Sequence, residues 1–162
     1  MRGVHDVNQL DGYFASGPNG YTPLTSTFNT VLAHNQDAIR ERKLLVMIVT
    51  DGEPTDNMGN VGVQDFRKAL SNRTPIERIF VTIVACTDDD ESISYLNRWD
   101  REIRNLDVVD DFRNEKSEVQ KAKGRNYRFS YGDYVVKSLI GAIDPKLDQF
   151  DEKAQNCCCS IF

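Results

Sequence analysis

Side chains that offer oxygen ligands occur at three points of the sequence where an apolar or helical segment begins or ends. Thr22 stands before an amphipathic segment, and Asp51 follows the apolar run 44–49. Asp88 and Asp89 follow a second apolar run. Hydroxyl and carboxylate oxygens are hard ligands, which suit Mg²⁺, Mn²⁺ or Ca²⁺ better than zinc. The pattern predicts a divalent-cation site to which these three points can contribute oxygen ligands, with Asp88 and Asp89 near its rim.

The elements that position these residues are read from the apolar pattern. Residues 44–49 and 79–86 are rich in β-branched side chains and do not alternate with polar ones. Such runs are typical of strands that are covered on both faces, as in a parallel sheet. Residues 106–109 indicate a short edge strand. In open α/β sheets, ligands lie beyond the carboxyl ends of the strands, where Asp51 and Asp88 are expected.

Apolar side chains at helical spacing fill the segments between the strands. Helices are predicted from residues 23–39, 63–70, 93–103 and 131–143. The first of them starts with Thr22 as a good N-cap and Pro23 at the first helical position. Strands that alternate with helices predict an α/β fold.

Individual side chains are assigned to the core or the surface from the same pattern. Trp99 and the tyrosines at helical spacing, such as Tyr131, are expected in the core. Cys86 is expected to be a small buried apolar side chain. The histidines, His34 among them, lie in polar surroundings and are expected at the surface.

Two motifs in this chain resemble those of von Willebrand factor A-type (vWA) domains. Residues 20–24 read Gly-Tyr-Thr-Pro-Leu, similar to the G-x-T-P-L segment of that family. Residues 43–54 resemble the apolar strand of the family that ends in T-D-G-x-P. The resemblance implies a Rossmann-like fold, with a mostly parallel sheet flanked by helices. It also implies a metal ion-dependent adhesion site with Thr22 and Asp51 as ligands. Such a module docks a protein partner whose carboxylate completes the coordination of the metal, and it catalyses no reaction.

The chain departs from the family pattern in its N-terminal part. The family site begins with D-x-S-x-S after the first strand, and residues 1–19 contain no such motif. We therefore expect residues 13–144 to form an incomplete domain, the C-terminal two-thirds of the family fold, after a lead-in of residues 1–12. Fewer protein ligands predict weak metal binding, because Mg²⁺ gives up its water reluctantly. A missing central strand also predicts an exposed sheet edge that favours self-association.

Each motif also has a purely structural interpretation. Thr22 can be only a helix N-cap, and Asp51 with the following glycine can be only a turn. Residues 90–94 match D-x-S-x-S literally, but they follow the T-D-G segment and are interpreted as the capped start of a helix.

A metal-dependent phosphohydrolase that uses Asp51 and residues 88–91 is the enzymatic alternative. The sequence offers no phosphate-cradling glycine loop, nucleophile elbow or paired histidines to support it.

Composition and charge argue against several classes of partner. The chain has 20 Lys and Arg against 25 Asp and Glu, a formal net charge of −5. This balance disfavours nucleic-acid phosphates and anionic membrane surfaces. Residues 1–10 resemble no secretory signal, and the cysteines form no disulfide framework. The protein is therefore expected in the cytoplasm.

The C-terminus carries a possible lipidation signal. The last four residues fit C-a-a-X with a terminal phenylalanine, which favours geranylgeranylation of Cys159. One lipid anchors a protein only marginally, and palmitoylation of Cys157 and Cys158 would supply a second anchor. Residues 145–162 are then a flexible tail that attaches the protein to the cytoplasmic face of a membrane. The alternatives are a chance cluster of cysteines and, for the whole chain, a metal-free scaffold tethered by this tail.

Overall fold

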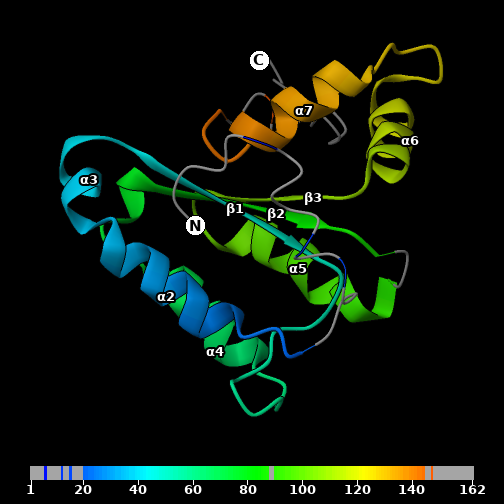
Figure 1. Ribbon diagram of the computed structural model, residues 1–162. Helices are drawn as coiled ribbons and strands as arrows, with labels where there is room; N and C mark the ends of the chain where they lie inside the picture. The colour runs from blue at the N-terminus through cyan, green and yellow to red at the C-terminus, as the bar shows by residue number, and fades with distance from the viewer. Residues whose placement is uncertain are drawn as a thin grey trace, which may run out of the picture.

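The structure is a computed structural model that describes residues 6, 12, 15, 20–87, 90–144 and 147 (Figure 1). Its sheet has three parallel strands in the order β1-β2-β3. They are β1 (Leu44–Thr50), β2 (Ile79–Ala85) and β3 (Leu106–Val109). All three predicted strands are thus confirmed to within one residue. Because the strands are parallel, their carboxyl ends lie at one edge of the sheet.

Helices lie on both sides of this sheet (Figure 1). They are α2 (Leu24–His34), α3 (Gln36–Glu41), α4 (Val63–Ser71), α5 (Asp90–Glu102), α6 (Phe112–Lys123) and α7 (Tyr131–Ile140), with a 3-10 turn η2 (Ile76–Arg78) before β2. Helices α2, α4 and α5 lie on one face, and α7 lies on the other (Figure 1). The described residues therefore form the mixed α/β architecture that the sequence predicts.

The main apolar core lies between the sheet and helices α2, α4 and α5. Phe66 of α4 contacts Phe28 of α2 and Trp99 of α5, with ring centroids 6.2 and 6.1 Å apart. Aromatic pairs at such distances add to the free energy of burying their area. Every residue of β2 is buried, as its sequence predicts.

Strand β1 is one of the two edge strands of the sheet that the structure describes, and it is less buried than β2. Two of its side chains, Met47 and Val49, are 40% and 65% exposed. The prediction that this run is covered on both faces is therefore wrong for β1. Alternation along the strand places these two side chains on the face opposite the main core, the face that carries α7.

A layer of buried polar groups joins α6 and α7 to the sheet. The Lys137 Nζ of α7 lies 2.7 Å from the Glu115 Oε1 of α6, and both side chains are only 2% exposed. Asp107 of β3 is also buried, at 1% exposed. A Cβ at Gly141 would come within 1.9 Å of Asp107 Oδ2, so the end of α7 approaches β3 at a distance that only glycine permits.

The first helix differs from its prediction in two respects. Residues 23–39 form two helices, because the chain leaves the helical path at Asn35, whose side-chain amide donates to Val31 O at 2.8 Å. Helix α2 begins at Leu24 with Pro23 at the N-cap position and no side-chain capping hydrogen bond. The prediction of Thr22 as the N-cap is therefore wrong.

Other expectations have mixed outcomes. The predicted helices 63–70 and 93–103 correspond to α4 and α5, and the helix 131–143 corresponds to α7, which ends at residue 140. Helix α6 was not predicted. Trp99 is buried and His34 is exposed, as expected, whereas Tyr131 is 64% exposed and Cys86 is exposed, contrary to expectation.

Several predictions concern residues outside the described part of the chain. These are the lead-in 1–12 apart from residues 6 and 12, the rim residues Asp88 and Asp89, and the lipidation site at residues 157–159. Among the described residues, no helix combines the length and the hydropathy needed to cross a membrane.

Candidate functional site

The backbone joins Thr22 to the loop that follows β1. Thr22 N donates to Thr55 Oγ1, and Thr55 N donates to Thr22 O, each at 2.8 Å. Ser26 Oγ donates to Asn57 Oδ1 at 3.3 Å, which attaches the first turn of α2 to the same loop. The two segments that carry the sequence motifs therefore meet at the carboxyl end of β1 (Figure 1).

Asp51 lies at the start of this loop, in a turn that Thr50 holds. The Thr50 hydroxyl is 3.2 Å from Gly52 O and 3.4 Å from Gly52 N. Thr50 itself is 7% exposed, and its carbonyl accepts from Cys86 N at 2.8 Å, which extends the pairing of β1 with β2. Asp51 is exposed. The chain bends at residues 51–52, and the Asp51 carboxylate is accessible to a ligand.

Thr22 and Asp51 offer the oxygen ligands that a hard divalent cation prefers, but they offer too few to complete its coordination. Thr22 is half-buried and offers a hydroxyl, and Asp51 offers a carboxylate. Mg²⁺ takes about six oxygen ligands, so most positions are left to water or to a partner. Within the described residues, no group of three or more His, Cys, Asp or Glu side chains is placed to hold a metal ion.

A polar pocket of about 270 Å³ lies beside this loop, between α2 and the start of α4. Its lining includes Ser26, Asn57 and Asp56. The loop itself uses the Asp56 carboxylate, which accepts from Asn60 Nδ2, Asn60 N and Met58 N at 2.7–2.9 Å. These hydrogen bonds, with that of the Asn60 side chain the strongest, lower the pKa of Asp56. The carboxylate therefore stabilises the loop conformation that holds Thr55.

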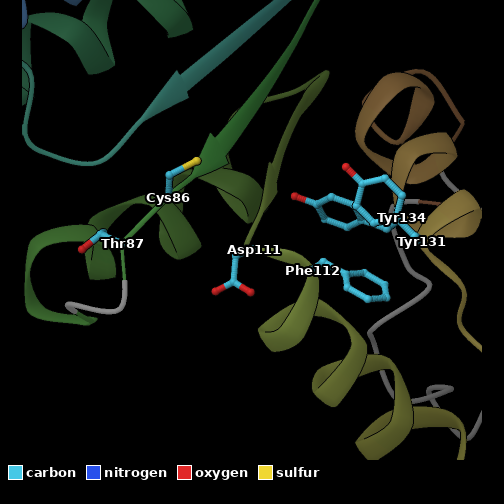
Figure 2. Close-up of a pocket in the computed structure, with 6 residues that line it drawn as sticks. All are labelled: Cys86, Thr87, Asp111, Phe112, Tyr131 and Tyr134. Atoms are coloured by element: carbon cyan, nitrogen blue, oxygen red, sulfur yellow. The ribbon is translucent and has the colours of Figure 1, made fainter. Parts of the chain in front are cut away.

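A second pocket, of about 430 Å³, lies beyond the carboxyl ends of β2 and β3 (Figure 2). It is lined by Cys86, Thr87, Asp111, Phe112, Tyr131 and Tyr134. These side chains come from the end of β2, the start of α6 and the start of α7. The pocket was not predicted, because its tyrosines were assigned to the core. Extending the strand-end rule to β3 would have indicated Asp111, which follows that strand.

Three aromatic rings form one wall of this second pocket. The Phe112 centroid lies 5.4 Å from that of Tyr131 and 5.6 Å from that of Tyr134, and the two tyrosine centroids are 5.8 Å apart. The hydroxyl of Tyr134 donates to Asp110 O at 3.1 Å, which fixes its ring. Both tyrosine hydroxyls point from α7 toward the side of the pocket where Cys86 and Asp111 lie (Figure 2).

Carboxylates contribute negative charge near Cys86 and Tyr134 of this pocket. Burial raises the pKa of the Cys86 thiol, and the charges of Asp51 and Asp111 raise it further. Burial and nearby negative charges, that of Asp111 among them, also raise the pKa of the Tyr134 phenol. Cys86 is thus a protonated thiol at neutral pH and a poor nucleophile. Asp51 follows β1 and Cys86 follows the parallel strand β2, so the candidate cation site and the pocket lie at the same edge of the sheet.

Comparison with known proteins identifies no relative of this chain. No family model matches the chain, and neither a curated protein nor a solved structure matches it. The fold and the site define an α/β domain with a parallel sheet and a ligand-accessible carboxyl edge.

Proposed function

We propose that this chain is a vWA-type protein-binding module that works in the cytoplasm and catalyses no reaction. In this proposal Thr22 and Asp51 hold a divalent cation, Mg²⁺ with Mn²⁺ or Ca²⁺ as substitutes, and a carboxylate of the partner completes its coordination. The observation that carries the proposal is the pair of hydrogen bonds between Thr22 and Thr55. They bring two motifs that are about 30 residues apart to one edge of the sheet, where ligands bind in open α/β folds.

Because the protein supplies few ligands, binding of the metal and binding of the partner depend on each other. One hydroxyl and one carboxylate supply a single negative charge, which is half of what a divalent cation requires. A carboxylate of the partner supplies the other half. By linkage, the partner must raise the affinity for the cation by the same factor by which the cation raises the affinity for the partner. Weak binding of the cation alone is therefore part of the proposal.

The edge of β1 offers the partner a surface next to this site. Among the described residues, no strand pairs with β1 on the side away from β2. Met47 and Val49, on the same strand, expose apolar area. Unpaired edges accept a strand from another chain. We therefore propose this edge as the surface for the partner or for self-association, which sedimentation at rising protein concentration measures.

Capture of a partner from a cell extract tests the proposed function. Wild-type protein, Asp51→Ala and Asp37→Ala are immobilised and exposed to extract in Mg²⁺ or in EDTA. Asp37 is the matched control, because its side chain is 98% exposed and it lies on α3, at the other end of β1 (Figure 1). We expect capture in Mg²⁺ by wild type and Asp37→Ala only. Equal capture by all three proteins in both buffers would contradict metal-dependent binding.

That contradictory result would leave the metal-free scaffold tethered by its C-terminal tail. The tail lies outside the described residues, so its test is biochemical. If Cys159 is lipidated, Cys159→Ser moves the protein from the membrane fraction to the cytosol. Magnesium-dependent hydrolysis of a phosphate ester that Asp51→Ala abolishes would instead support the enzymatic alternative.

A further inference from the structure

We propose that the pocket between the end of β2 and the starts of α6 and α7 binds the guanidinium group of an arginine side chain. The inference rests on the binding function proposed above, because the arginine belongs to the protein partner. The pocket is large enough to admit one long side chain, at about 430 Å³, near the lower end of the range for ligand pockets.

The aromatic wall supplies the first part of the argument. Guanidinium groups are planar and stack on aromatic faces, where cation–π attraction adds to contact area. Tyr131 is 64% exposed although it contacts two other rings, so the fold leaves one of its surfaces uncovered. Phe112 already has the ammonium of Lys116 at 5.7 Å from its ring centroid. The tyrosines are therefore the rings that a ligand cation can use.

The carboxylate of Asp111 supplies the second part. Asp111 caps α6, and its Oδ1 accepts from Arg113 N at 2.6 Å and from Asn114 N at 3.3 Å. Both bonds use Oδ1, and Oδ2 accepts neither of them. A guanidinium can stack on a tyrosine ring and donate a hydrogen bond to Asp111 Oδ2 at the same time. The ammonium of a lysine is a compact, strongly hydrated charge and stacks poorly.

An anionic occupant does not suit this place, although two helices start here. Helix N-termini attract anions through their unpaired N–H groups. Asp111 occupies that position on α6, and Asp133 occupies it on α7, where its Oδ2 lies 2.7 Å from Ser130 N. Both helix starts thus already carry a carboxylate, and Asp51 and Asp111 make the surroundings more negative still.

Titration of the ¹⁵N-labelled full chain with small probes tests this inference without the partner. The probes are Nα-acetylarginine amide, its uncharged isostere Nα-acetylcitrulline amide, and Nα-acetyllysine amide, all in EDTA. We expect arginine amide to shift the amides of Cys86, Thr87 and Phe112 with a millimolar dissociation constant. Equal shifts with citrulline amide would overturn a charged occupant, and equal affinity for lysine amide would overturn the guanidinium.

Two variants and a control assign the binding to the pocket. Asp111→Asn keeps a capping side chain on α6 and removes the charge, so we expect affinity to fall about tenfold. Tyr131→Ala should weaken binding by a similar factor. Tyr127→Ala, at the opposite end of α6, should leave it unchanged. Unchanged affinity in both pocket variants would overturn the inference.

The result is separable from the proposed function, because EDTA removes any cation. Arginine binding together with metal-independent capture would sustain the pocket and contradict the cation site. Metal-dependent capture without any arginine binding would support the cation site and contradict the arginine pocket.

Discussion

Thr22 and Thr55 exchange two hydrogen bonds of 2.8 Å, one through the Thr55 hydroxyl and one between backbone groups. The exchange fixes the backbone of Thr22 against the loop after β1, one residue before the N-cap position of α2. It also explains how the short segment before α2 comes to lie beside the loop that begins at Asp51. The candidate site thus depends on hydrogen bonds between the segment before α2 and the loop after β1.

Replacing Thr55 tests the structural weight of this interaction. Thr55→Val keeps the shape of the side chain but leaves Thr22 N without its acceptor, so we expect a loss of about 1 kcal/mol in the free energy of unfolding. Thr55→Ser keeps the hydroxyl and should stay close to wild type. Urea denaturation measures both variants. Equal stability of the valine and serine variants would show that the hydroxyl contributes nothing.

Replacing Arg73, which lies away from the candidate site, should lower the free energy of unfolding much more than replacing Thr55. Its side chain is 4% exposed and donates to Ile79 O at 3.3 Å and Asn105 O at 2.9 Å, as well as to the carbonyls of Leu70 and Arg104. Burial lowers its pKa to about 10, so it stays charged at neutral pH. Arg73→Met should cost about 3 kcal/mol in the free energy of unfolding, because buried carbonyls lose their donor.

Arg73→Lys is the informative companion, since an ammonium cannot reach carbonyls of three segments at once. Its stability in denaturant should lie between those of wild type and Arg73→Met. A stability of Arg73→Met equal to that of wild type would contradict the role of Arg73 in joining α4, β2 and the turn before β3.

The buried pair of Lys137 and Glu115 should behave differently in single and double variants. Lys137→Met leaves a carboxylate buried beside α7, and we expect a cost of about 4 kcal/mol. Lys137→Met combined with Glu115→Leu removes both charges and should recover much of that loss. Thermal or chemical unfolding measures the coupling. Additive losses in the double variant would show that the two groups do not act as a pair.

The start of α7 should loosen in acid. Hydrogen bonds from the Ser130 backbone and then its side chain lower the pKa of Asp133 below its usual 3.8. A lowered carboxyl pKa stabilises the folded state above the unfolded pKa, and this stabilisation is lost as the pH falls through the folded pKa. Amide shifts of residues 130–134 should therefore change only below about pH 4. Asp133→Asn should abolish that change, and its persistence would assign the transition to another group.

The sequence predicts the sheet well because β2 and its partners are defined by uninterrupted apolar runs. It predicts the surface poorly wherever exposure depends on tertiary neighbours. Met47 and Val49 are exposed because their burial depends on which helices cover each face of the sheet, and not on the apolar run itself. Tyr131 follows helical spacing as faithfully as Trp99 does, but its ring faces the pocket rather than the core.

Sequence patterns also fail to predict helix α6 and the buried polar groups beneath α7. Glu115 and Lys137 are buried, whereas charged residues are expected outside, so α6 has too few apolar positions to be recognised. In the candidate site, the sequence indicates Thr22 and Asp51 through their motifs. The second pocket draws on residues 86–134, and no local pattern joins Cys86 to Tyr134.

Titration with a cation tests the central proposal most directly. Mn²⁺, a paramagnetic substitute for Mg²⁺, is added to ¹⁵N-labelled wild type, Asp51→Ala and Asp37→Ala. We predict weak binding that selectively broadens the amides of Thr22, Asp51 and Gly52 in wild type and Asp37→Ala, is displaced by Mg²⁺, and disappears in Asp51→Ala. Broadening that is absent at these amides, or that persists unchanged in Asp51→Ala, would contradict a cation site at Thr22 and Asp51.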